Sequence, residues 1–138
     1  MQLLFIADPL RTFMVYKDST YAMMREAAAR GHGIAFCEPR HLRWQRGGQV
    51  MAAVQTLRLT GDEQGNWYEA TAAQPQPLTA FDAVLMRKDP PFDAEYIYAT
   101  HLLETVISSI SSFSAFSIIF FNSVFCFSSS FDIFTQQV

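Results

Sequence analysis

Three short runs of apolar residues limit what this chain can fold into more than any other feature. They are LLFIA at 3–7, GIAFCE at 33–38 and AVLMR at 83–87. Short runs without alternation of apolar and polar residues are typical of strands buried on both faces, as in parallel sheets. TYAMMREAAAR at 20–30, which lies between the first two runs, is rich in helix-forming residues. This order of strand, helix and strand predicts an α/β fold.

Residues at the ends of the first helical segment predict where that helix begins and ends. Asp18 or Ser19 precedes the helix-forming residues and can accept a backbone N–H as an N-cap. Gly31 follows them, at the position where a left-handed residue commonly ends a helix. The sequence therefore predicts one helix between these residues.

Later segments complete the predicted order of elements. Two adjacent glycines divide residues 43–59 into two extended arms, which indicates a β-hairpin. The proline-containing stretch 72–82 is expected to be a connection across the surface. A second helix is expected within 89–104, with Asp89 or Asp93 as its N-cap.

Charged residues are distributed so unevenly that the chain divides into two segments. Residues 1–104 carry all 10 Lys and Arg and 12 of the 13 Asp and Glu, whereas residues 105–138 carry only Asp132. Ser and Phe supply 18 of the 29 residues from Val106 to Phe134. We therefore expect a folded domain over the first segment, long enough to bury roughly 60–70% of its extended surface. The second segment is expected to be an aberrant, Ser/Phe-rich hydrophobic tail.

Charge and motif content argue against several classes of function. The first segment has a net charge of −2, from 10 basic and 12 acidic side chains, and nucleic-acid binding requires a basic surface. The sequence has no glycine-rich phosphate loop and no nucleophile elbow, so no catalytic or cofactor-binding residue is expected. The three histidines and two cysteines lack the spacing of metal ligands. Two cysteines in separate segments also form no disulfide framework, which favours a reducing, cytoplasmic compartment.

One stretch places charged residues where ligands bind in α/β proteins. Arg87, Lys88 and Asp89 lie at the end of the third apolar run, and Asp8 follows the first. In open α/β sheets, ligands bind at the carboxyl ends of the strands. Arg87 can bind a carboxylate through two parallel hydrogen bonds, and the two prolines after Asp89 restrict that residue to extended geometry. Arg87, Asp89 and Asp8 are therefore our candidate substrate-binding residues.

A purely structural interpretation fits the same residues. Asp89 can cap the helix that follows it, with Arg87 and Lys88 as solvated charges at the start of that helix. Asp8 at the end of a strand can be structural in the same way. The residue pattern alone leaves both interpretations open.

The same stretch carries a resemblance to a known family. VLMRKDPPFDAEYIYATHLLE, residues 84–104, is similar to the N-terminal domain of the prokaryotic-type glutathione synthetases. ADP after the first strand, KDSTYAMMREAAARGH at the first helix and TLRL in the hairpin region agree with this resemblance, which covers residues 1–104. It implies a Rossmann-like pre-ATP-grasp domain, with a mainly parallel sheet flanked by helices and a β-hairpin insertion.

The resemblance also implies a reaction and its ligands. Members of the family join γ-glutamylcysteine and glycine to form glutathione, using ATP and Mg²⁺. Arg87 corresponds to the arginine of the MRKDPP loop that faces the peptide substrate, and the correspondence is weaker for Asp8 and Asp89. The family continues into an ATP-grasp portion that supplies the ATP, magnesium and glycine sites. We therefore expect a truncated, cytoplasmic ligase that by itself binds neither ATP nor Mg²⁺, is inactive, and is compatible with a homo-oligomer.

Residues 105–138 resemble no part of that family, and three origins are open for them. A frameshifted or inserted reading frame would explain the composition, because pyrimidine-rich codons encode Phe and Ser. A membrane anchor is disfavoured, because the frequent serines need partners in lipid and no basic residue follows the apolar segment. The tail can also fold back onto the domain. A different class of function stays open as well, namely a non-catalytic protein that binds a small peptide or a subunit.

Overall fold

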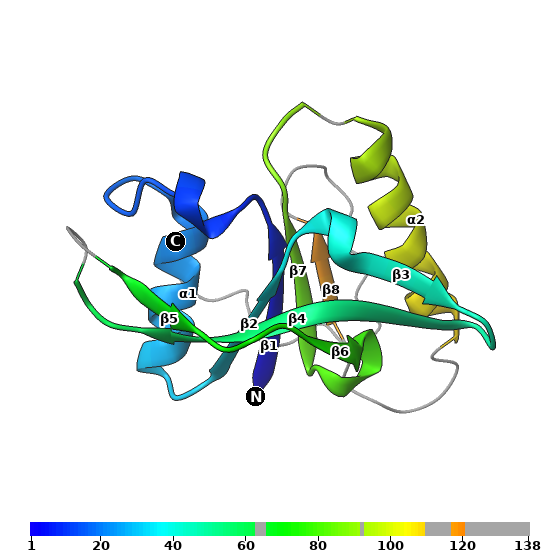
Figure 1. Cartoon of the computed structure of the whole chain (residues 1–138), viewed down its shortest axis with the longest axis horizontal. Coiled ribbons are helices and arrows are strands. Elements are labelled where there is room, and N and C mark those ends of the chain that lie inside the picture. The colour runs from blue at the N-terminus through cyan, green and yellow to red at the C-terminus, as the bar shows by residue number, and fades with distance from the viewer. Residues whose placement is uncertain (63–65, 92, 110–116, 121–138) are drawn as a thin grey trace.

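One mixed sheet forms the centre of the protein (Figure 1). The computed structural model describes residues 1–62, 66–91, 93–109 and 117–120, and only the backbone of 107–109 and 117–120. The strand order is β3-β4-β2-β1-β7-β8, and β5 and β6 also pair with β4. The strands are β1 (Gln2–Ala7), β2 (Gly33–Cys37), β3 (Leu42–Gln45), β4 (Gln49–Leu59), β5 (Tyr68–Ala70), β6 (Gln74–Pro77), β7 (Ala83–Arg87) and β8 (Ser117–Phe120). The α-helices are α1 (Ser19–Ala29) and α2 (Ala94–Ser109), and the 3₁₀ turns are η1 (Leu10–Thr12), η2 (Pro39–His41) and η3 (Leu78–Ala80).

The sheet is parallel around β1 and antiparallel around β4. β1 lies between β2 and β7 and runs parallel to both. β4 runs antiparallel to β2, β3, β5 and β6. The turn between β3 and β4 contains Gly47 and Gly48 at φ values of +109° and +87°, which glycine adopts without steric cost. The α/β class and the hairpin predicted from the sequence are confirmed.

Alternating side chains of the central strands pack against one helix on each face of the sheet. Leu4 and Ile6 of β1 lie in the same core cluster as Leu103 of α2. Phe5, between them, lies in the other cluster with Met24 of α1. Figure 1 shows the two helices on opposite sides of the strands. Because both faces are covered, the strands are apolar at consecutive positions.

Asp18 begins α1 and is one of the two caps predicted for it. Its Oδ1 accepts the backbone N–H of Thr20 at 2.7 Å and that of Tyr21 at 3.1 Å. These bonds satisfy two of the amides that have no partner within the first turn of a helix. Gly31 follows the helix at φ +78°, the left-handed conformation predicted for it.

The second helix begins after Asp93, one of the two predicted caps, but ends later than the sequence indicates. Asp93 Oδ1 accepts the backbone N–H of Tyr96 at 3.0 Å, so Asp93 and not Asp89 caps α2. The helix continues past Glu104 to Ser109. Val106 is only 3% exposed and belongs to the core cluster beneath α2. The domain boundary expected at residue 104 therefore falls inside a helix.

Residues 72–82 contain a strand that the sequence did not predict. Gln74–Pro77 forms β6, with Pro75 opposite Ala53 and Pro77 opposite Met51 of β4. Proline has no backbone N–H to donate, which argued against a strand. In antiparallel pairs only every second residue exchanges both hydrogen bonds with its neighbour, so prolines two positions apart can be accommodated together.

Part of the expected tail takes part in the sheet. The segment Ser117–Phe120 forms β8 and pairs in parallel with β7. The remaining tail residues, 110–116 and 121–138, lie outside the described residues, so the origin of the tail stays a prediction. Within the described part of the chain, no helix combines the length and apolarity needed to cross a membrane.

Candidate functional site

The carboxyl ends of β1 and β7 lie side by side (Figure 1). The candidate residues are at these two ends. Ala7 and Arg87, the last residues of the two strands, are opposite each other in parallel register. Asp8 follows one strand, and Lys88 and Asp89 follow the other. The sheet therefore brings together residues that are 81 positions apart in the sequence.

Strand alternation directs Arg87 and Lys88 to opposite faces of the sheet. Leu85 packs in the core cluster that faces α1, and Arg87, two residues later, continues that face. Met86 packs in the cluster that faces α2, and Lys88 continues that face. The site thus has an Arg87 half beside α1 and a Lys88 half beside α2.

Arg87 reaches the N-terminal end of α1. Its Nη2 donates to Ser19 Oγ at 2.6 Å, and its Nε donates to Thr20 Oγ1 at 3.2 Å. The N-terminus of a helix carries a partial positive charge, so a cation there is unfavourable unless acceptors or an anion offset it. The two hydroxyls provide such acceptors. Sequence reasoning missed these partners, although DST at the start of the predicted helix was a signal that hydroxyls lie near the strand ends.

Asp8 joins the two strand ends on the other half of the site. Its Oδ1 lies 2.9 Å from Lys88 Nζ, and its Oδ2 accepts the backbone N–H of Asp89 at 2.8 Å. The hydrogen bond with Asp8 raises the pKa of Lys88, and the charges of Asp8, Asp93 and Glu95 raise it further against the opposing effect of burial. Lys88 therefore stays protonated at neutral pH, which preserves the ion pair.

The three predicted site residues differ in their surroundings. Asp8 pairs with Lys88 and accepts a hydrogen bond from the backbone of Asp89, so it holds the segment after β7 in place. Arg87 is half-buried, while Asp89 is exposed at the same edge of the sheet. The structure therefore places the half-buried, cationic Arg87 and the exposed Asp89 at one edge of the sheet.

The described residues do not fit a magnesium ion. In the part of the chain that the structure describes, no group of three His, Cys, Asp or Glu is placed to hold a metal. Mg²⁺ prefers carboxylates together with phosphate oxygens. Both carboxylate oxygens of Asp8 already accept hydrogen bonds, from Lys88 and from Asp89. No step of the chemistry is therefore assigned to a metal at this edge.

Cys37 has no property of a nucleophile. Its side chain is 1% exposed. Burial raises the pKa of its thiol to about 12, and the charge of Glu38 contributes to the rise. Because the thiolate is the reactive form of cysteine, Cys37 is inert at neutral pH.

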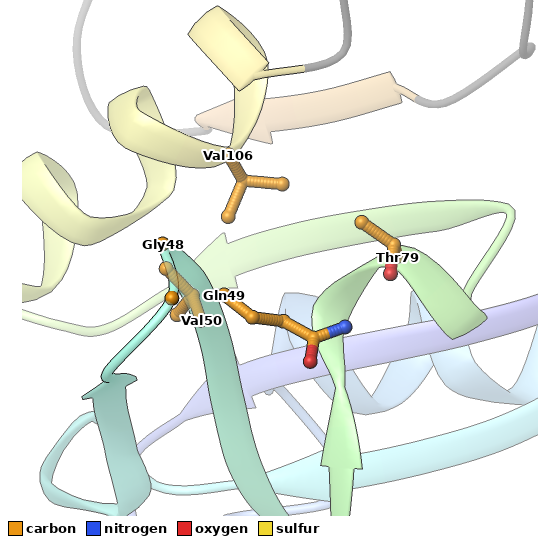
Figure 2. Close-up of a pocket in the computed structure, with 6 residues that line it drawn as sticks. Gly48, Gln49, Val50, Thr79 and Val106 are labelled. Carbon is orange, nitrogen blue, oxygen red and sulfur yellow. The ribbon is translucent and has the colours of Figure 1, made fainter.

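A cavity of about 320 Å³ is separate from the candidate residues. It lies between the β3–β4 turn, η3 and α2, and Figure 2 shows Val106 above Gln49 and Thr79. Its lining residues are Gly47, Gly48, Gln49, Val50, Thr79 and Val106. These side chains carry no group that titrates near neutral pH, so the cavity offers no acid–base or nucleophilic chemistry.

Comparisons with known proteins identify similar chains. A family model described as the prokaryotic glutathione synthetase, N-terminal domain, matches residues 1–112. The glutathione synthetase of Ralstonia nicotianae is 58% identical over 105 residues, which cover 75% of this chain and 32% of that protein. The glutathione synthetase of Nitrosomonas europaea is 51% identical over 106 residues, with 75% and 33% covered, and that of Neisseria meningitidis serogroup A is 47% identical over 105 residues, with 75% and 33% covered. The chain spans about a third of the length of the curated relatives it matches.

Proposed function

We propose that this chain, which belongs to the prokaryotic glutathione synthetase N-terminal domain family, forms the peptide-binding wall of an ATP-dependent ligase. The ligase would join γ-glutamylcysteine and glycine to form glutathione. One observation carries the proposal for this site. The guanidinium of Arg87 is held by Ser19 and Thr20 at the carboxyl ends of two parallel strands.

The chemistry of the dipeptide fits this edge of the sheet. γ-Glutamylcysteine carries two carboxylates and one ammonium group. A guanidinium binds a carboxylate through two parallel, charge-assisted hydrogen bonds, and the partial positive charge at the start of α1 adds to this attraction. Asp89 is exposed and offers an acceptor for the ammonium group. Asp8 and Lys88 hold the segment that carries Asp89 in place.

Activation of the cysteinyl carboxylate is assigned to other parts of the family's chain. Ligases of this type need ATP, a metal and both substrates positioned together, and positioning supplies much of the rate. The described residues here do not fit Mg²⁺, and about two thirds of the length of the Ralstonia nicotianae relative lies outside the matched region. We therefore expect the 138-residue chain by itself to form no glutathione.

A chimaera tests the proposed role of Arg87. Residues 1–112 of this chain replace the matching part of the Ralstonia nicotianae glutathione synthetase. We expect ATP-dependent formation of glutathione from γ-glutamylcysteine and glycine. Arg87→Ala should raise the KM for the dipeptide about 10- to 150-fold, because a charge-assisted hydrogen bond contributes roughly 1.5–3 kcal/mol. The KM for ATP should not change.

Arg58→Gln is the matched control, because it removes an exposed arginine that pairs with Glu69 between β4 and β5. Its dipeptide KM should equal that of the unsubstituted chimaera. An active chimaera in which Arg87→Ala leaves the dipeptide KM unchanged would refute the role of Arg87. A folded chimaera that forms no glutathione would refute the proposed function as a whole.

A further inference from the structure

The bonds between Arg87 and α1 involve one particular edge of the guanidinium. Nε–H and one N–H of Nη2 point in the same direction, and these two nitrogens donate to Thr20 and Ser19. The Nη1–Nη2 end of the group points in a different direction. In proteins, the Nη1–Nη2 end of an arginine can bind a carboxylate through two parallel hydrogen bonds. The hydroxyls therefore set the direction in which Arg87 presents its carboxylate-binding end.

The two hydroxyls are themselves held in place by the start of α1. Asp18 accepts the backbone N–H groups of Thr20 and Tyr21, which fixes the first turn. Tyr21 and Met24 anchor the helix in the core, where they are 2% and 0% exposed. Thr20 is 5% exposed, whereas Ser19 is exposed. The acceptors thus belong to a packed helix and not to a loop.

We propose that Ser19 and Thr20 are positioning residues that orient the Arg87 guanidinium for the carboxylate of the peptide substrate. This inference rests on the proposed function. An arginine side chain has several rotatable bonds, and fixing it in its binding geometry before the ligand arrives lowers the entropic cost of binding. Neither hydroxyl needs to touch the substrate. Their effect on binding passes through Arg87.

Kinetics of the chimaera test this role. Ser19→Ala and Thr20→Val each remove one acceptor, and valine keeps the shape of threonine in the buried site. Each should raise the dipeptide KM about 3- to 10-fold, the range for one net hydrogen bond, with the ATP KM unchanged. Ser19→Thr and Thr20→Ser keep the hydroxyl, so the dipeptide KM of each should stay close to that of the unsubstituted chimaera. Thr100→Val is the control, because its hydroxyl donates to Ile97 O within α2.

A double-mutant cycle separates positioning from a general structural effect. If the hydroxyls act through Arg87, Ser19→Ala and Thr20→Val should have no further effect on KM in the Arg87→Ala background. If they act by supporting the fold or by touching the substrate directly, their effects should add to that of Arg87→Ala. Additive effects would overturn the inference.

A second measurement needs only the 138-residue chain and no ligand. The Nε–H signal of Arg87 in a ¹⁵N NMR spectrum should exchange slowly with water because it is bonded to Thr20. Thr20→Val should accelerate that exchange at least about 3-fold, whereas Thr100→Val should not. An Nε–H that exchanges equally fast in all three proteins would refute the inference.

The two proposals fail in different ways. If Arg87→Ala raises the dipeptide KM but the hydroxyl variants do not, only the positioning role is wrong. If Arg87→Ala itself leaves KM unchanged in an active chimaera, the proposed role of Arg87 fails and the positioning role fails with it.

Discussion

Lys88 and Asp8 join the ends of two neighbouring parallel strands, with 2.9 Å between Nζ and Oδ1. Their side chains are only 15% and 26% exposed, so water screens this pair less than a typical surface pair. The second oxygen of Asp8 accepts the backbone N–H of Asp89. One carboxylate thus holds both the side chain and the main chain of the segment that follows β7.

Asp8→Asn tests how much this connection stabilises the domain. Asparagine keeps the shape and one acceptor oxygen but removes the charge that pairs with Lys88. Because Lys88 is largely shielded from water, we expect the free energy of unfolding to fall by about 1–3 kcal/mol. Urea denaturation of the 138-residue chain measures this change.

Glu69→Gln is the control for Asp8→Asn. Glu69 and Arg58 form an ion pair whose side chains are 56% and 74% exposed. Exposed pairs contribute little, so the loss should stay below about 1 kcal/mol. Equal losses for the two variants would show that the Asp8 pair behaves as an ordinary surface contact.

Val106→Ala tests whether the folded domain continues beyond residue 104. Val106 is 3% exposed in the core beneath α2, and its truncation leaves a small cavity. We expect the free energy of unfolding to fall by about 1–3 kcal/mol. Thr105→Ala, at the exposed neighbouring position, should change it by less than about 0.5 kcal/mol. If neither variant changes stability, the domain ends before Val106, as the sequence indicated.

Cys37 should make the domain sensitive to alkaline pH. Its thiol pKa is about 12 in the folded protein, against the ordinary value of 9.0. Below pH 9 the Cys37 thiol is protonated in both the folded and the unfolded chain, so its burial does not yet lower the free energy of unfolding. As the pH rises further, the unfolded chain loses the proton first, and stability falls until the pH reaches the folded pKa.

Comparison with Cys37→Ala isolates this contribution, because the other titrating groups are common to both proteins. From pH 8 to about pH 10.5, the parent chain should lose about 2 kcal/mol more unfolding free energy than the variant. Urea denaturation at several pH values measures the difference. Parallel stability curves for the two proteins would contradict the assigned pKa.

Local sequence patterns were sufficient for much of the fold. The apolar runs became β1, β2 and β7 because strands covered on both faces leave few polar positions. Asp18 caps the start of α1 and Gly31 follows its end, as predicted, because caps depend on neighbouring residues alone. β6 was missed because its prolines argued against a strand, and the end of α2 was missed because the composition changes within that helix.

The sequence by itself determined that Arg87, Asp89 and Asp8 lie at the ends of buried strands, and its motif indicated the family to which the chain belongs. Only the tertiary structure decided which side chains meet there. The parallel register of β1 and β7 brings Asp8 to Lys88, and the packing of α1 on one face of the sheet brings its first hydroxyls to Arg87. Local patterns specify elements because they act over a few residues. Strand order and helix packing decide contacts between distant residues, since these depend on how the whole chain buries its apolar surface.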